Sequence, residues 1–152
     1  MESLIQLRTR DVVAYLGRDY IVEGVLTYKV ASKVFRLARA VDGDDVLWVE
    51  ALVDDLDDRL LMFSEVKDLD VATPPPQSIL YRKSAFLPRW SGRATIEVSG
   101  KVPTDRGAGA REVWRYRAAG DLFLHIEAGT GGTSVLYGES VHKGMVDVLP
   151  GR

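Results

Sequence analysis

The chain of 152 residues contains no cysteine and only two histidines, His125 and His142. Without thiols it cannot form disulfides, use thiol catalysis or bind metal through thiolates, and two histidines exclude a histidine-rich metal centre. It also lacks an apolar run near the ~20 residues that a membrane-spanning helix needs, and its first residues carry no basic flank typical of a secretory signal. We therefore expect a cytoplasmic protein without a transmembrane segment, a metal site or a cofactor.

The balance of charge excludes another class of protein. The chain has 20 basic and 22 acidic residues, a net charge of −2, which does not suit a protein that binds duplex nucleic acid through its phosphates. The charge is unevenly placed, because residues 42–70 are mostly acidic and residues 82–117 mostly basic. Either the basic block docks an acidic partner, or the two blocks complement each other within the molecule. We favour the second interpretation slightly.

Alternation of apolar and polar residues is the main structural signal. Residues 20–28 (YIVEGVLTY) place apolar side chains at every second position, and Gly24 in the middle indicates a bulge or bend. Further strands are expected at 11–16, 33–41, 46–52, 59–66, 93–101, 110–118, 121–128, 133–137 and 145–149, separated by turns rich in Asp and Gly. Short strands joined by such turns are typical of antiparallel hairpins.

The two halves of the sequence resemble each other. Residues 35–40 (FRLARA) correspond to 114–118 (WRYRA), and 47–50 (LWVE) correspond to 124–127 (LHIE) at a nearly constant spacing. This order is what an internal duplication would leave, although any two β meanders share alternation and turn chemistry. Three prolines at 74–76 separate the halves.

We therefore predict an all-β fold with little helix, built from two pseudo-repeated antiparallel curved sheets or small open barrels packed together. Residues 1–72 would form the first β unit, 73–92 a proline-rich linker and connecting segment, and 93–152 the second β unit. Units of this size rarely fold alone, so the two would form one compact body.

Four segments carry a resemblance to a known family. They are residues 17–28 (GRDYIVEGVLTY), 47–50 (LWVE), 113–118 (VWRYRA) and 137–139 (YGE). With them the chain resembles the bacterial domain of unknown function 4178 family from about Leu7 to Gly151. The resemblance implies a genomic setting beside membrane-stress proteins of the phage-shock-protein-A type, small membrane proteins and polyamine-related enzymes. It transfers no catalytic residue, because the family has no accepted catalytic motif.

One pair of residues could carry chemistry. His125 and Glu127 lie two apart on one expected strand, so both point to the same face together with Phe123, and the opposite face with Leu124 is the expected core side. A carboxylate beside an imidazole can form a proton-transfer pair or a two-point ligand. The alternative, which we favour, is that Glu127 bonds across strands to Arg115 or Arg117.

The acidic turns at 42–45 and 54–58 and the Gly-rich segment 129–134 suggest structure rather than chemistry. The turns lack the spacing of a calcium loop, so solvated hairpin tips are expected. The Gly-rich segment has no following lysine and leads into a strand, which favours a flexible hairpin over a phosphate-binding loop.

The connecting segment 78–92 is the remaining candidate site. It contains Tyr81, Phe86, Arg89 and Trp90, and aromatic residues among arginines are typical of recognition patches. The segment could contact a partner, or it could fasten one unit to the other by filling the space between sheets.

These features favour a non-catalytic binding or adaptor module with a protein partner. A link to a membrane-associated stress assembly rests on the family resemblance alone. The alternative is a small-molecule or cation binder, for a polyamine-like ligand, that uses Glu50 and the acidic residues 42–58. A small hydrolase-type enzyme using His125 and Glu127 is the third and weakest hypothesis. A deep cavity holding Glu50, His125 or Glu127 would favour a ligand, whereas a flat patch with Phe86 and Trp90 would favour a partner.

Overall fold

The computed structural model describes residues 7–51, 59–103, 107–129 and 131–151. They form eleven strands in one antiparallel sheet. The strands are β1 (Val12–Tyr15), β2 (Arg18–Val30), β3 (Lys33–Asp42), β4 (Asp45–Ala51), β5 (Arg59–Val66), β6 (Ile79–Tyr81), β7 (Ser84–Gly100), β8 (Gly109–Ala118), β9 (Leu122–Gly129), β10 (Gly132–His142) and β11 (Val146–Leu149). The helical content of the described residues is one 3₁₀ turn, Lys143–Met145, so the predicted all-β fold with little helix is confirmed.

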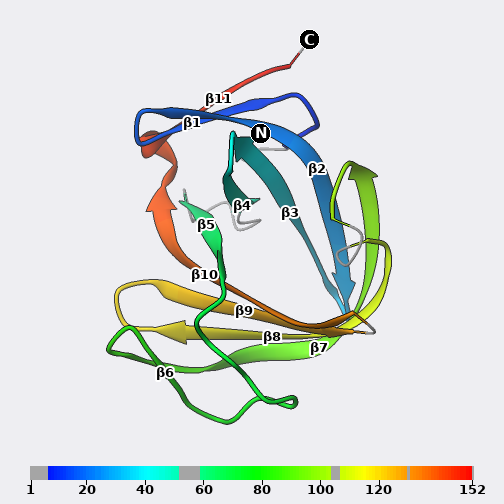
Figure 1. Ribbon diagram of the computed structural model, residues 1–152, viewed down its shortest axis with the longest axis vertical. Coiled ribbons are helices and arrows are strands. Elements are labelled where there is room, and N and C mark those ends of the chain that lie inside the picture. Colours follow the sequence, from blue (N-terminus) through cyan, green and yellow to red (C-terminus); the bar gives the residue numbers. More distant parts are fainter. Residues whose placement is uncertain (1–6, 52–58, 104–106, 130, 152) are drawn as a thin grey trace.

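Eight of the strands close into a barrel. Their order is β2-β3-β4-β5-β10-β9-β8-β7, and β7 pairs again with β2. In Figure 1, β2, β3, β4 and β5 form one wall, and β7, β8 and β9 form the opposite wall. β1 and β11 extend the sheet beyond β2, and β6 extends it beyond β7. Closure leaves no exposed edge among the barrel strands.

The seam between β2 and β7 depends on a bulge and two glycines. A register shift between Val22 and Gly24 bends β2, so that its first part pairs with β1 and its second part with β7. Gly24 lies opposite Gly100. A Cβ atom at Gly24 would lie 2.2 Å from the carbonyl oxygen of Lys101, and one at Gly100 would lie 2.4 Å from that of Glu23. The predicted bulge at Gly24 is therefore confirmed, and its cause is the close approach of two backbones.

Apolar side chains are buried on both faces of the sheet. The interior cluster fills the barrel with residues such as Leu26, Tyr28, Phe35, Leu37, Trp48, Phe63 and Ile96. The first-half outer cluster, which includes Val13, Tyr20, Val22, Val49 and Met62, packs beneath β1 and β11. The second-half outer cluster, which includes Ile79, Tyr81, Phe86, Tyr116, Leu124 and Ile126, packs beneath β6. Both faces are therefore apolar, and alternation alone does not identify the interior.

The structure does not contain the two packed sheets that the sequence suggested. Each half contributes four consecutive barrel strands, β2–β5 and β7–β10, but the halves join edge to edge through β2–β7 and β5–β10. The reason is that a separate four-stranded sheet would leave two edges of unpaired N–H and C=O groups, which edge-to-edge joining satisfies. The equal strand order agrees with a duplication, and the duplication itself stays a prediction.

The connecting segment is also more ordered than a linker. Residues 79–81 form β6, and β7 begins at Ser84, well before the strand expected at 93–101. Residues 84–92 therefore belong to a barrel strand, paired with β8 through Leu87 and Trp90.

Candidate functional site

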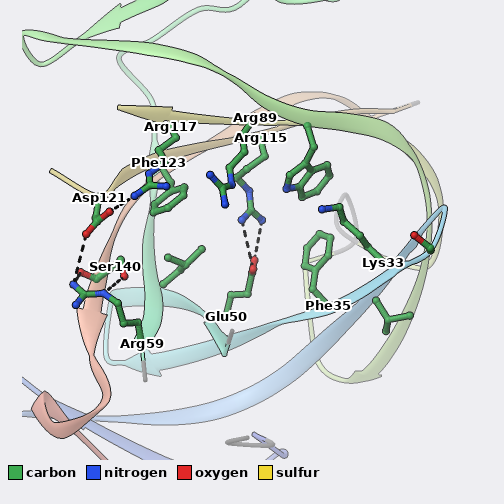
Figure 2. Close-up of a pocket in the computed structure, with 14 residues that line it drawn as sticks. Lys33, Phe35, Glu50, Arg59, Arg89, Arg115, Arg117, Asp121, Phe123 and Ser140 are labelled. Atoms are coloured by element: carbon green, nitrogen blue, oxygen red, sulfur yellow. Dashed lines mark hydrogen bonds and ion pairs between the residues drawn. The ribbon is translucent and has the colours of Figure 1, made fainter. Parts of the chain in front are cut away.

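A cavity of about 640 Å³ opens at one end of the barrel. Because neighbouring strands run in opposite directions, the starts of β3, β5 and β9 meet the ends of β4, β8 and β10 at this end. We call this space the mouth cavity. Its floor and walls are drawn in Figure 2, and its principal side chains are Lys33, Phe35, Glu50, Arg59, Arg89, Trp90, Arg115, Arg117, Asp121, Phe123 and Ser140.

A buried ion pair forms the floor of the mouth cavity. Arg115 Nη2 lies 2.8 Å from Glu50 Oε1, and the two side chains are 3% and 8% exposed. The guanidinium carbon of Arg115 also lies 5.4 Å from the ring centre of Phe35, 5.1 Å from Phe63 and 5.2 Å from Trp90. Desolvation makes a buried charge costly unless it is paired, and the carboxylate and the ring faces together compensate Arg115. The floor is therefore fixed before any ligand enters.

His125 holds Arg115 from behind. Arg115 Nε and Nη2 lie 3.1 Å and 2.9 Å from His125 Nδ1. Since a guanidinium can only donate, Nδ1 accepts, and the proton of the neutral ring is on Nε2, which donates to Glu127 Oε2 at 2.7 Å. Burial lowers the pKa of His125, and the charge of Arg115 lowers it further, while Glu127 and Glu50 act in the opposite direction. His125 is therefore a neutral bridge.

Glu127 ends this line of side chains on the side away from the mouth cavity. It is 1% exposed, it accepts a hydrogen bond from the Tyr28 hydroxyl, and its Oε1 lies 3.7 Å from Arg111 Nη1. A continuous chain of contacts therefore crosses the barrel from Tyr28 on β2 to Glu50 on β4. Glu50 and Arg115 are the members of this chain that line the mouth cavity.

Two different walls rise from the floor (Figure 2). On one side Arg117 pairs with Asp121, and Arg59 Nη2 lies 4.0 Å from Asp121 and donates to the backbone oxygen of Ser140 at 2.9 Å. On the other side the rings of Phe35 and Trp90 meet edge to face with centroids 5.5 Å apart. Lys33 Nζ lies 5.3 Å from the Trp90 ring centre. The mouth cavity thus combines a polar wall with an aromatic wall.

The predicted patch at 78–92 is divided by the fold. Phe86 and Tyr81 are 0% and 7% exposed in the second-half outer cluster, where the Tyr81 hydroxyl donates to Asp68. Arg89 and Trp90 instead line the mouth cavity. The four residues therefore form no common surface, because Tyr81 and Phe86 are buried in the second-half outer cluster.

The expected face of His125 and Glu127 is confirmed, but its surroundings differ from the prediction. Phe123 lies in the interior cluster, and His125 and Glu127 join it by hydrogen bonds to interior side chains. Leu124, expected on the core side, packs in the second-half outer cluster. The expected cross-strand partners of Glu127 are engaged elsewhere, because Arg115 pairs with Glu50 and Arg117 pairs with Asp121.

Sequence reasoning missed several residues of the mouth cavity, above all Arg115, Lys33, Arg59 and Asp121. A signal for Arg115 was present: it shares a strand face with Val113, and both faces of that strand carry apolar residues. A cation on a face that is buried in a closed barrel requires a buried acid, and Glu50 is that acid.

Among the described residues, neither the acidic turn at 42–45 nor the Gly-rich segment lines the mouth cavity. Asp42 and Asp45 flank the β3–β4 turn and pair with Arg18, whereas residues 54–58 lie outside the described residues. β9 and β10 pair antiparallel as far as Gly129 and Gly132 in the Gly-rich segment, of which residue 130 lies outside the described residues. Among the described residues, no group of three or more His, Asp or Glu side chains is arranged to hold a metal ion. In the same part of the chain, no helix has the length and hydropathy needed to span a bilayer.

Comparison with known proteins identifies a family. The model of the domain of unknown function family DUF4178 matches residues 8–143, nearly the whole chain, so the protein belongs to this family, as the sequence resemblance indicated. Neither a curated protein nor a solved structure matches the chain.

Proposed function

We propose that this member of the DUF4178 family is a non-catalytic binding protein that takes a small organic molecule into the mouth cavity. The observation that carries the proposal is a space of about 640 Å³ above a rigid, buried Glu50–Arg115 pair. Ligand pockets are typically ~300–1,000 Å³, lined by apolar and aromatic side chains with a few fixed polar groups. The aromatic wall and the ion-paired floor match that description.

The position of His125 supports a binding role over catalysis. A general base must reach the proton that it abstracts, but Nδ1 of His125 is occupied by Arg115 and Nε2 by Glu127. His125 is fully buried behind the floor of the mouth cavity. The pair His125 and Glu127 therefore supports the floor, which weakens the hydrolase hypothesis.

Where the module works follows from the family resemblance. We propose that it acts in the bacterial cytoplasm, beside a protein partner in a membrane-associated stress assembly. The burial of Tyr81 and Phe86 removes two of the three aromatic residues that we expected to contact such a partner. Ligand binding in the mouth cavity is thus the better supported part of the proposal.

A neutral fluorescent dye tests the binding function. N-phenyl-1-naphthylamine should bind the purified protein with enhanced fluorescence, and Val34→Trp at the cavity wall should weaken binding at least about tenfold by occupying the space. Val34 is 48% exposed and lines the cavity. Leu80→Trp on β6, which is 74% exposed and outside the cavity, is the matched control and should bind as the parent does. Equal binding by both variants, or none by the parent, contradicts the proposal.

A further inference from the structure

The charge of the mouth cavity indicates what kind of molecule it holds. Five basic and two acidic side chains line it, an excess of three positive charges among the described residues. Charges of one sign within a cleft with low-dielectric walls reinforce each other and concentrate ligands of the opposite sign. The chain as a whole has a net charge of −2, so this excess is a property of the site.

Both acidic groups of the mouth cavity already have cationic partners. Glu50 pairs with the buried Arg115. Asp121 lies between Arg117 and Arg59, pairing with the first and lying 4.0 Å from the second. These carboxylates are therefore poor receptors for an incoming cation, because binding one would require breaking an existing pair.

Two cations of the mouth cavity remain available to a ligand. Within the described part of the chain, no carboxylate lies within 4.0 Å of Lys33 or Arg89, so neither has an ion pair there. Lys33 is placed above the Trp90 ring, and Arg89 precedes Trp90 on β7. Both are exposed. Figure 2 shows Arg89 beside Arg115, and the amino group of Lys33 near the ring of Phe35. The free cations thus adjoin the aromatic wall.

On the basis of the proposed binding function, we infer that the ligand is a small organic molecule with a compact dianionic group, a phosphate monoester, attached to an apolar ring or chain. The phosphate is held by Arg89 and Lys33, with Arg59 and Arg117 nearby, and the apolar part packs against Trp90 and Phe35. Arginine and lysine are suited to phosphate by charge-assisted hydrogen bonds. This assignment is opposite in sign to a polyamine-like ligand.

Three naphthyl compounds of different charge test the inference by displacing N-phenyl-1-naphthylamine. At pH 7.5, 1-naphthyl phosphate should compete at least about tenfold better than neutral 1-naphthol, and 1-naphthylmethylamine should compete worst. Increasing salt should weaken the phosphate selectively. Equal competition by the phosphate and the alcohol, or preference for the amine, overturns the inference, while the dye result with Val34→Trp still upholds the binding function.

Two arginines on β7 provide matched variants. Arg89→Gln should weaken 1-naphthyl phosphate about tenfold and leave 1-naphthol unchanged. Arg93→Gln removes the same charge from the same strand at a side chain that is 75% exposed and outside the cavity, and it should have no effect. Equal effects of the two variants would show that only the general field of the protein attracts the anion, and would overturn the inference.

The phosphate can belong to a soluble metabolite or to a lipid headgroup. Vesicles of phosphatidylcholine with and without phosphatidic acid distinguish these sources by co-sedimentation. Binding to phosphatidic acid vesicles that Arg89→Gln abolishes assigns the site to a lipid phosphate. Binding of 1-naphthyl phosphate without vesicle binding assigns it to a soluble compound. Absence of both overturns the inference.

Discussion

The glutamates Glu50 and Glu127 occupy the same position in the two halves and have different surroundings. Each lies on the third barrel strand of its half, β4 or β9, and both are buried. Glu50 meets Arg115 at the floor of the mouth cavity, whereas Glu127 is held by Tyr28 and His125 deeper in the barrel. Acids on the third barrel strand of each half therefore line the mouth cavity in one half and join a buried network in the other.

The difference originates two residues earlier on each strand. Trp48 precedes Glu50, is fully buried and donates its indole N–H to Glu65 at 3.3 Å. His125 precedes Glu127 and connects it to Arg115. An indole offers one donor and no acceptor, while an imidazole offers both. His125 can therefore connect two polar side chains across the interior, whereas Trp48 cannot.

Removing the ion-pair partner of Glu50 has the largest expected effect on stability. Arg115→Met should lower the free energy of unfolding by about 3–5 kcal/mol, because it leaves Glu50 buried without a partner. The double variant Arg115→Met/Glu50→Leu should recover most of the loss, since an apolar pair of similar volume replaces both charges. Urea denaturation of the two variants measures the effect, and a double variant as unstable as the single one contradicts it.

Glu127→Gln should have a smaller effect of about 1–3 kcal/mol on unfolding. Its amide oxygen can replace Oε2, which accepts from both Tyr28 and His125. The NH₂ group then faces Arg111 in place of Oε1, so the buried ion pair with Arg111 is lost. Glu50→Gln should differ in its effect on ligands, since it frees donors of Arg115 and adds positive charge to the mouth cavity. Titration with 1-naphthyl phosphate should show tighter binding for Glu50→Gln and unchanged binding for Glu127→Gln. Equal affinities would remove the functional distinction between the two acids.

His125, which lies between Arg115 and Glu127, predicts that the free energy of unfolding depends on pH by at most about 1.4 kcal/mol per pH unit. The folded protein holds the pKa of His125 below its ordinary value of 6.5, so as the pH falls through 6.5 the unfolded chain binds a proton that the folded protein does not. The free energy of unfolding therefore decreases as the pH falls below 6.5, until the folded pKa is reached. Above pH 6.5 the stabilising contribution of the neutral His125 is fully present.

His125→Gln tests this pH dependence, because its amide can replace both hydrogen bonds without titrating. Urea denaturation at pH 7.5, 6.5 and 5.5 should show a shallower loss of stability for His125→Gln than for the parent. His142→Gln, which replaces the other histidine of the sequence at an exposed position, is the matched control. Parallel curves for the parent and His125→Gln would show that His125 takes up its proton equally in both states.

Local patterns predicted the strands well and their closure poorly. The alternation around Gly24 located β2 and its bulge, and the Asp-rich turn at 42–45 located the β3–β4 hairpin. The start of β7 was missed because residues 78–92 were assigned to the connecting segment. Pro88 is accommodated beside a register shift between Pro88 and Trp90, where a missing N–H donor is tolerated.

The candidate site was predicted only in part, and the reason for what was missed is related. Glu50, Arg89 and Trp90 were identified from composition and position, and all three line the mouth cavity. Arg115 and Lys33 were missed because their meeting with Glu50 and Trp90 depends on how β3, β4, β7 and β8 close around a shared interior. Alternation shows which residues share a face of one strand, but it does not show which strands lie opposite each other.

The two joins between the halves, β2–β7 and β5–β10, have a consequence for synthesis of the chain. While the ribosome has released only the first half, β2 and β5 lack the neighbours that β7 and β10 later provide, and both edges can pair with other nascent chains. Pairing of strands so distant in sequence also makes closure a slow step of folding. The barrel therefore closes only after the last strands have been translated. The protein is most exposed to aggregation on polysomes, where several incomplete chains lie close together.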